Sequence, residues 1–134
     1  MELKKSYKGF VLWMIGYVAA LLALAIIPAV DEGLVMRYTM MVTVWAVAGM
    51  AFIIWRTESV YWYNGTTFED AVAAGSERRK ESARRHLAIF VRFALMMTAV
   101  SVVMMLLGWS AWIDFAFGTV GLCVAGFMTV PIKL

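Results

Sequence analysis

The sequence predicts an all-α integral membrane protein, a bundle of four transmembrane helices made of two hairpins. Hydrophobic residues make up 63% of the chain and charged residues only 16%, whereas soluble domains average about 45–50% and about 25%. A domain of 134 residues cannot hide that much apolar surface from water, because small domains bury only about two-thirds of what the unfolded chain exposes. We therefore expect a single domain whose excess apolar surface faces lipid.

Four apolar segments are long enough to cross a bilayer, which takes about 20 helical residues. Helices are expected because a backbone in lipid must satisfy its hydrogen bonds internally. The predicted spans are residues 10–30, 34–55, 87–108 and 113–131. The first span follows a positively charged start, as a secretory signal does. Its apolar run exceeds the roughly 7–15 residues of a signal core, so we expect an uncleaved helix.

The basic residues predict the orientation of the four spans. Three lysines precede the first span, six basic residues lie in the loop at residues 56–86, and one lysine follows the last span. The short connections at 31–33 and 109–112 contain no Lys or Arg. Because cytoplasmic segments carry the excess of Lys and Arg, we expect a multi-pass protein of the cell membrane with both termini and the central loop in the cytoplasm.

The central loop contains signals for helical structure of its own. Thr66 and Glu69 have the spacing of a capping box, in which each side chain satisfies a free backbone N–H of the other residue. A short helix is predicted from Phe68 to Ala74, ending at Gly75. Ser76 has the side chain of a second N-cap, so the helix that contains the third span is expected to begin near residue 77, outside the membrane, and to run unbroken to about residue 107.

The stretch "GSERRKESARRH", residues 75–86, forms the start of that long helix and is strongly basic. Nucleic-acid binding is not expected, because acidic residues are interleaved with the basic ones and no aromatic alternation accompanies them. The run orients the protein, and contact with anionic lipid is a further role that its charge allows. Arg84, Arg85 and Arg92 are the candidate contacts to lipid phosphate, and a charge facing the bundle interior is the alternative for Arg92.

Arg37 and Asp114 are the other charged residues inside predicted spans. Charge within a membrane is costly and is often functional. Both residues lie near the predicted outer boundary, where they could reach the headgroups or pair with each other across helices. They are therefore candidates either for an interhelical ion pair or for a polar pathway.

An internal duplication is a further hypothesis. When the first hairpin is shifted by 77 positions, "VAG" at 47–49 aligns with "VAG" at 124–126, and Arg37 aligns with Asp114. Identity elsewhere is no better than chance, so the correspondence is one of hydropathy. Any four-helix protein with one long central loop would align in this way, which is the alternative explanation.

Enzymatic function is not expected. The chain has one histidine, His86, and one cysteine, Cys123, which argues against a metal-ligand cluster and a bis-histidine haem site within one chain. Neither a phosphate-binding loop nor a Ser/His/Asp set with plausible placement is found. We predict no catalytic residue, no metal and no cofactor.

Two classes of function are compatible with the sequence. The one we expect is a homo-oligomer with a transport or channel role, in which several protomers form the pathway because four helices enclose too little volume for a solute route. The alternative is a non-transporting accessory protein, such as a partner of a membrane complex, an immunity factor or a scaffold, whose protein partner is unknown. Stripes of small residues, Gly16/Ala20 and Gly121/Ala125/Thr129, allow close helix packing within one bundle or between protomers.

Overall fold

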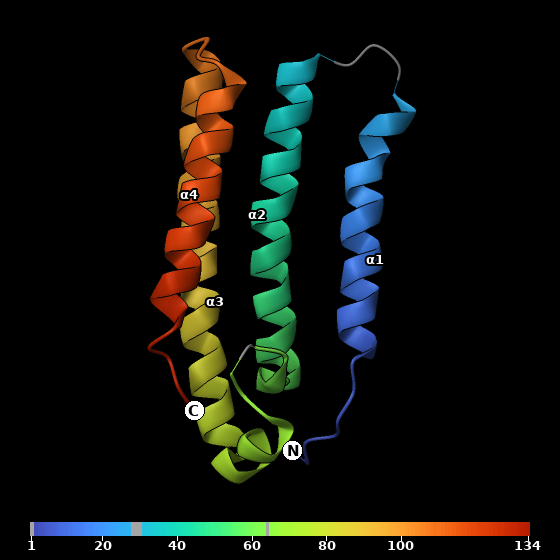
Figure 1. The fold of residues 1–134 in the computed structure, drawn as a ribbon, viewed down its shortest axis with the longest axis vertical. Helices are drawn as coiled ribbons and strands as arrows, with labels where there is room; N and C mark the ends of the chain where they lie inside the picture. The colour runs from blue at the N-terminus through green and yellow to red at the C-terminus, as the bar shows by residue number, and fades with distance from the viewer. Residues whose placement is uncertain (1, 28–30, 64) are drawn as a thin grey trace.

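The computed structural model is all-helical over the residues it describes, which are 2–27, 31–63 and 65–134. Four helices in it are long and apolar enough to cross a membrane, as the sequence predicts. They run roughly parallel to the long axis of the molecule (Figure 1). Both chain ends lie at the lower end in that view, which we call the basic end; the opposite end, with the turn between the last two helices, is the hairpin end.

The first span is divided into two kinds of helix. α1 comprises Lys8–Leu22 and continues as a 3₁₀ turn, η1, over Ala23–Ile26. Ile27 then has an extended backbone, with φ −93° and ψ 112°, as expected for a residue that precedes a proline. Residues 28–30 of the predicted span lie outside the described residues.

The second and fourth spans begin earlier than predicted because each has a side-chain N-cap. α2 comprises Glu32–Thr57, and the Asp31 carboxylate accepts a hydrogen bond from the Leu34 backbone N–H at 3.0 Å. Most of the predicted connection at 31–33 is therefore helix, and that prediction was wrong. α4 comprises Ala111–Thr129, and its N-cap Ser110 accepts from the Trp112 N–H at 3.3 Å.

The central loop is helical, as the sequence predicts. A short 3₁₀ turn, η2, comprises Val60–Trp62, and α3 follows over Phe68–Leu106. The helix is interrupted at Gly75, where φ is 78° and ψ is 165°, a conformation that essentially only glycine adopts. The predicted end of a short helix at this glycine and the restart after it are therefore both present in the structure.

The capping box of α3 lies one residue later than predicted. Thr67 and Asp70 form it: the Thr67 hydroxyl oxygen accepts from the Asp70 N–H at 3.1 Å, and the Asp70 carboxylate accepts from the Thr67 N–H at 3.2 Å. The Thr66 N–H donates a hydrogen bond to the Tyr63 carbonyl in the preceding turn, at 3.4 Å. Thr66 thus belongs to that turn, and Thr67 is the extended residue that starts the helix.

The helices make unequal contributions to the core. α2 packs against both α3 and α4, and α3 packs against α4, whereas α1 lies beside α2 (Figure 1). The main core cluster consists of buried residues from α2, α3 and α4, namely Met40, Val44, Ala48, Phe93, Ala94, Met97 and Ala125. No described residue of α1 is buried. A three-helix core with one peripheral helix is the resulting arrangement.

Hydrogen bonds attach α1 to α2. The Trp13 indole N–H donates to the Ala46 carbonyl at 2.8 Å, and the hydroxyl groups of Tyr17 and Thr43 are 2.9 Å apart. Hydrogen bonds of this kind hold helices together in lipid. Apolar side chains gain little free energy there by packing on one another, because the lipid tails are equally apolar.

Candidate functional site

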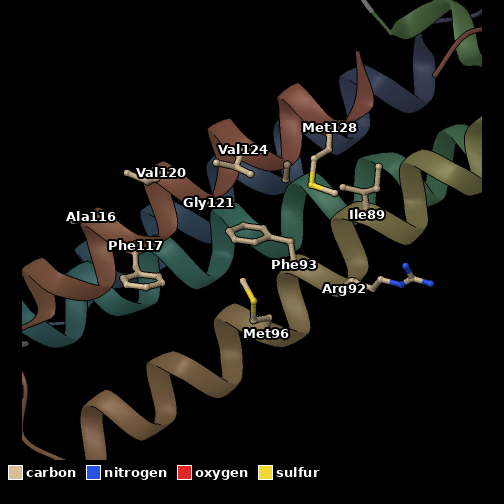
Figure 2. Close-up of a pocket in the computed structure, with 11 residues that line it drawn as sticks. Ile89, Arg92, Phe93, Met96, Ala116, Phe117, Val120, Gly121, Val124 and Met128 are labelled. Atoms are coloured by element: carbon tan, nitrogen blue, oxygen red, sulfur yellow. The ribbon is translucent and has the colours of Figure 1, made fainter. Parts of the chain in front are cut away.

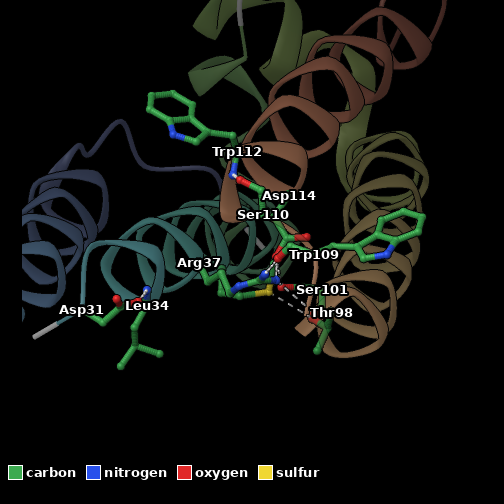
Figure 3. Close-up of polar contacts among 10 residues, drawn as sticks. Asp31, Leu34, Arg37, Thr98, Ser101, Trp109, Ser110, Trp112 and Asp114 are labelled. Atoms are coloured by element: carbon green, nitrogen blue, oxygen red, sulfur yellow. Dashed lines mark hydrogen bonds and ion pairs between the residues drawn. The ribbon is translucent and has the colours of Figure 1, made fainter. Parts of the chain in front are cut away.

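The hairpin end contains a polar cluster centred on Arg37 of α2 (Figure 3). Its guanidinium forms an ion pair with the carboxylate of Asp114 in the first turn of α4. It also donates to the carbonyl of Trp109 and, at 3.4 Å, to the carbonyl of Ser101 on α3. One side chain of α2 is thereby bonded to α3, to α4 and to the turn between them.

Asp114 is almost completely buried in this cluster, with 1% of its surface exposed. The Ser101 hydroxyl donates to the same carboxylate oxygen, Oδ2, at 2.7 Å. Its other oxygen, Oδ1, is buried and has no hydrogen-bond partner among the described residues. The position in the first turn of α4 suits a negative charge, because the N-terminal end of a helix is electropositive. The cluster therefore connects α2, α3 and α4 through one ion pair and several hydrogen bonds.

Arg84, Arg85 and Arg92 all lie on the exposed side of α3. Arg84 and Arg85 both form ion pairs with Glu81, with N–O distances of 2.9 and 3.0 Å. Arg92 makes no hydrogen bond or ion pair with any described residue, and its guanidinium extends away from the α4 side chains (Figure 2). The three arginines therefore do not form one converging site. Of the three, only Arg92 has no carboxylate partner among the described residues and can pair with an external anion.

An apolar groove of ≈ 550 Å³ runs between α3 and α4. We call it the α3–α4 groove, and Figure 2 shows the side chains along it. Its lining residues are Ile89, Arg92, Phe93, Met96, Ala116, Phe117, Val120, Gly121, Val124, Ala125 and Met128. Gly121 packs so closely on the Phe93 ring that an added Cβ would overlap it. Part of the small-residue stripe on α4 therefore serves packing within one chain, while the groove itself remains exposed.

A second buried ion pair, which sequence reasoning missed, lies at the basic end. Glu58 follows α2 directly and is only 1% exposed. Its carboxylate accepts a hydrogen bond from the Arg79 Nε–H at 3.0 Å and one from the Ser76 hydroxyl at 2.8 Å. The Nη2 of Arg79 forms an ion pair with the same carboxylate at 2.8 Å. The Lys80 ammonium lies 3.5 Å away. Arg79, counted from the sequence as an orienting surface charge, is 3% exposed and joins α3 to the end of α2.

The electrostatics of this pair favour the ionised carboxylate. Burial by itself raises the pKa of Glu58, but hydrogen bonds from Ser76 and Arg79 and the charges of Arg79 and Lys80 outweigh it, so the pKa is lower than usual. Glu58 also has a left-handed backbone, with φ 58°. One signal in the sequence marks it: an acidic residue at the C-terminal end of a helix opposes the helix dipole and needs a compensating cation.

The described residues contain no group of three or more His, Cys, Asp or Glu side chains that could hold a metal ion. Among the described residues, the main features are the two buried ion pairs, Arg37–Asp114 and Glu58–Arg79, and the exposed α3–α4 groove with Arg92 beside it. Comparison of the chain with family models, with curated proteins and with solved structures finds no match.

Proposed function

We propose that this chain is a non-transporting interaction protein of the cell membrane, which binds a transmembrane helix of a partner protein in the α3–α4 groove. Both termini and the segment 56–86 lie in the cytoplasm in this proposal, because the basic residues gather at that end. The observation that carries the proposal is that the charges inside the spans are used for structure or face outward, whereas a large apolar groove is left open.

The shape of the groove favours a helix as its occupant. The α4 residues that line the groove combine small side chains, Ala116, Gly121 and Ala125, with larger ones. Small residues let helix backbones approach closely in a membrane, where packing rather than hydrophobic transfer drives association. Phe117 and Met96 are half-exposed along the groove and offer apolar surface to a partner.

A transport role has less support within one chain. The Arg37–Asp114 pair, the candidate polar pathway, is closed by bonds to Ser101 and Trp109. An apolar cluster of side chains from α2, α3 and α4 fills the core of the bundle. Transport would therefore require a pathway between protomers of a homo-oligomer.

Photo-crosslinking from the groove tests the proposal. Phe117 in the groove and Phe52 on α2 are 54% and 50% exposed, so each can be replaced by benzoylphenylalanine as a matched pair. We expect a protein adduct in native membranes from position 117 and not from position 52. An adduct of two copies of this chain would favour the homo-oligomer, and solute flux into liposomes that contain the purified chain would then support transport. Adducts with lipid alone would contradict an interaction role.

A further inference from the structure

A polar pocket lies at the basic end, separate from the α3–α4 groove. It has a volume of ≈ 530 Å³ and lies between Tyr63, which follows η2, and the side of α3 at Ser82 and His86. The end of α4 and the segment that follows it, as far as Lys133, complete its lining. We call it the basal pocket. Its lining combines chain segments that are far apart in the sequence, so only the folded chain forms it.

Three side chains in the basal pocket have hydrogen-bonding groups that the described residues do not satisfy. The Tyr63 hydroxyl is buried without a partner. His86 and Ser82 are each 6% exposed. The His86 Nδ1 lies 2.9 Å from the Ser82 carbonyl of its own helix, which leaves Nε2 for an outside group, and the Ser82 hydroxyl makes no bond with a described residue.

The packing fixes these groups in place. The rings of Tyr63 and His86 stack with their centroids 4.1 Å apart and an angle of 15° between their planes. A buried hydroxyl without a partner destabilises a fold, so the Tyr63 hydroxyl is a donor that an acceptor from outside the chain can satisfy. Because burial raises the pKa of Tyr63, its hydroxyl stays protonated and able to donate.

The charges around the pocket favour an anion. Lys133 lines it, and no carboxylate side chain occurs among its described lining residues. A smaller adjoining pocket of ≈ 390 Å³ shares Lys133 and adds Arg78 and Asp70, but the Asp70 carboxylate is already bonded to the Thr67 hydroxyl at 2.7 Å. Neither cation forms an ion pair with a described residue.

The C-terminal end of α4 does not reverse this preference. A helix C-terminus is electronegative, but two of its carbonyls at the pocket already accept hydrogen bonds. The Gly126 carbonyl accepts from the Thr129 hydroxyl at 2.6 Å, and the Thr129 carbonyl accepts from the Ile132 N–H at 3.0 Å. Lys133 follows directly and adds positive charge at this point.

We propose that the basal pocket binds a phosphate group, to which Tyr63, Ser82 and Lys133 donate hydrogen bonds. The neutral Nε2 of His86 accepts from a protonated phosphate oxygen or from a hydroxyl next to it. The pocket lies at the end of helices that are apolar enough to cross a membrane, so the phosphate can belong to a lipid headgroup or to a soluble phosphate ester. Both sources offer the same chemistry to these donors.

Gly126 provides a way to block the pocket without disturbing the helices. Gly126 lines the pocket, and a Cβ added there meets no atom within 4 Å, so the side chain of Gly126→Leu has room to occupy part of the pocket. Gly16 on α1 also has nothing within 4 Å of an added Cβ. Gly16→Leu is therefore the matched control, far from the basal pocket.

The test uses the purified full chain in a neutral detergent and measures its unfolding temperature with three probes. These are dioctanoyl phosphatidate, dioctanoyl glycerol, which lacks the phosphate, and glycerol phosphate, which lacks the acyl chains. We expect a saturable upward shift with phosphatidate and none with dioctanoyl glycerol. A matching shift with glycerol phosphate would identify a soluble ligand, and its absence a lipid. No shift with either phosphate probe overturns the proposal.

Variants tie the shift to the pocket. Tyr63→Phe and Lys133→Gln should each weaken phosphate binding about tenfold, since a hydrogen bond to a charged group is worth about that factor or more. Gly126→Leu should abolish the shift and Gly16→Leu should keep it. Without phosphate, Tyr63→Phe should unfold at the same or a higher temperature, because it removes an unsatisfied donor. A shift that survives Gly126→Leu but is lost in Arg92→Gln would place the phosphate on α3 instead and refute the basal pocket.

Discussion

The carboxylate of Glu58 and the guanidinium of Arg79 form a buried ion pair, in which Nη2 and Nε of Arg79 lie 2.8 and 3.0 Å from the same carboxylate oxygen. The pair connects Glu58, the residue after α2, to the part of α3 that follows directly after the break at Gly75. Arg79 also donates to the Ala71 carbonyl at 2.9 Å, on the other side of that break. The pair thus stabilises the fold of the whole basic end.

Glu58→Gln should destabilise the protein by about 3–5 kcal/mol, because it leaves the buried charge of Arg79 without its carboxylate counter-charge. Unfolding in a mixed-micelle denaturant series measures this. Glu81→Gln is the control, since it removes a carboxylate from the exposed pairs with Arg84 and Arg85, and exposed pairs contribute little. Equal effects of the two substitutions would contradict a structural role of the buried pair.

The same carboxylate predicts a pH dependence. The pKa of Glu58 is lower in the folded chain than its ordinary value, so the folded state holds its proton more weakly than the unfolded state. The stability that Glu58 contributes is fully present above the ordinary glutamate pKa and is lost as the pH falls through the lowered pKa. Unfolding temperatures between about pH 7 and pH 3 should fall on the acid side, and less steeply in Glu58→Gln. Parallel curves for the two proteins would exclude Glu58 as a source of the slope.

The Arg37–Asp114 ion pair predicts that substitutions of its two residues have coupled effects on the free energy of unfolding. Asp114→Asn should cost about 3–5 kcal/mol, because Arg37 remains nearly buried without a counter-charge. Adding Arg37→Gln should recover part of that loss, since residues in one network are not additive. A double-mutant cycle in detergent measures the coupling, and strictly additive losses would argue against the pair.

The close packing of α4 predicts opposite effects for two glycines. Gly121→Ala should destabilise by about 1–3 kcal/mol, because its Cβ overlaps the Phe93 ring and forces that core side chain to move. Gly49→Ala on α2 meets no atom within 4 Å and should stabilise by about 0.5–1 kcal/mol, since alanine favours a helix interior over glycine. Thermal unfolding of both variants is the measurement, and a stable Gly121→Ala protein would show that α3 and α4 can separate without cost.

The sequence predicted the features that depend on neighbouring residues. The apolar runs identified all four helices, and Gly75 marked the break in α3, because each signal acts within a few positions. The errors in helix starts also have local causes. Asp31 and Ser110 cap their helices, although both stand in segments that the apolar pattern alone assigns to connections.

The candidate site was predictable only in part. Arg37 and Asp114 stood out because charge in an apolar span is conspicuous, and the sequence left their pairing as one of two alternatives. Glu58 did not stand out, because a single acidic residue in a charged loop resembles many exposed ones. The basal pocket combines Tyr63, His86 and Lys133 from three segments, and no spacing in the sequence indicates that they meet.

By itself the sequence determined a chain of four helices suited to lipid and the uneven distribution of its basic residues, since hydropathy and charge are properties of each segment. Only the tertiary structure decided that Arg37 meets Asp114, that Arg79 is buried against Glu58 and that α1 stays outside the core. The reason is physical: in lipid, apolar side chains gain little by leaving their surroundings. Which helices associate therefore depends on the fit of glycines to rings and of carboxylates to guanidinium groups, and these contacts exist only once the helices are packed.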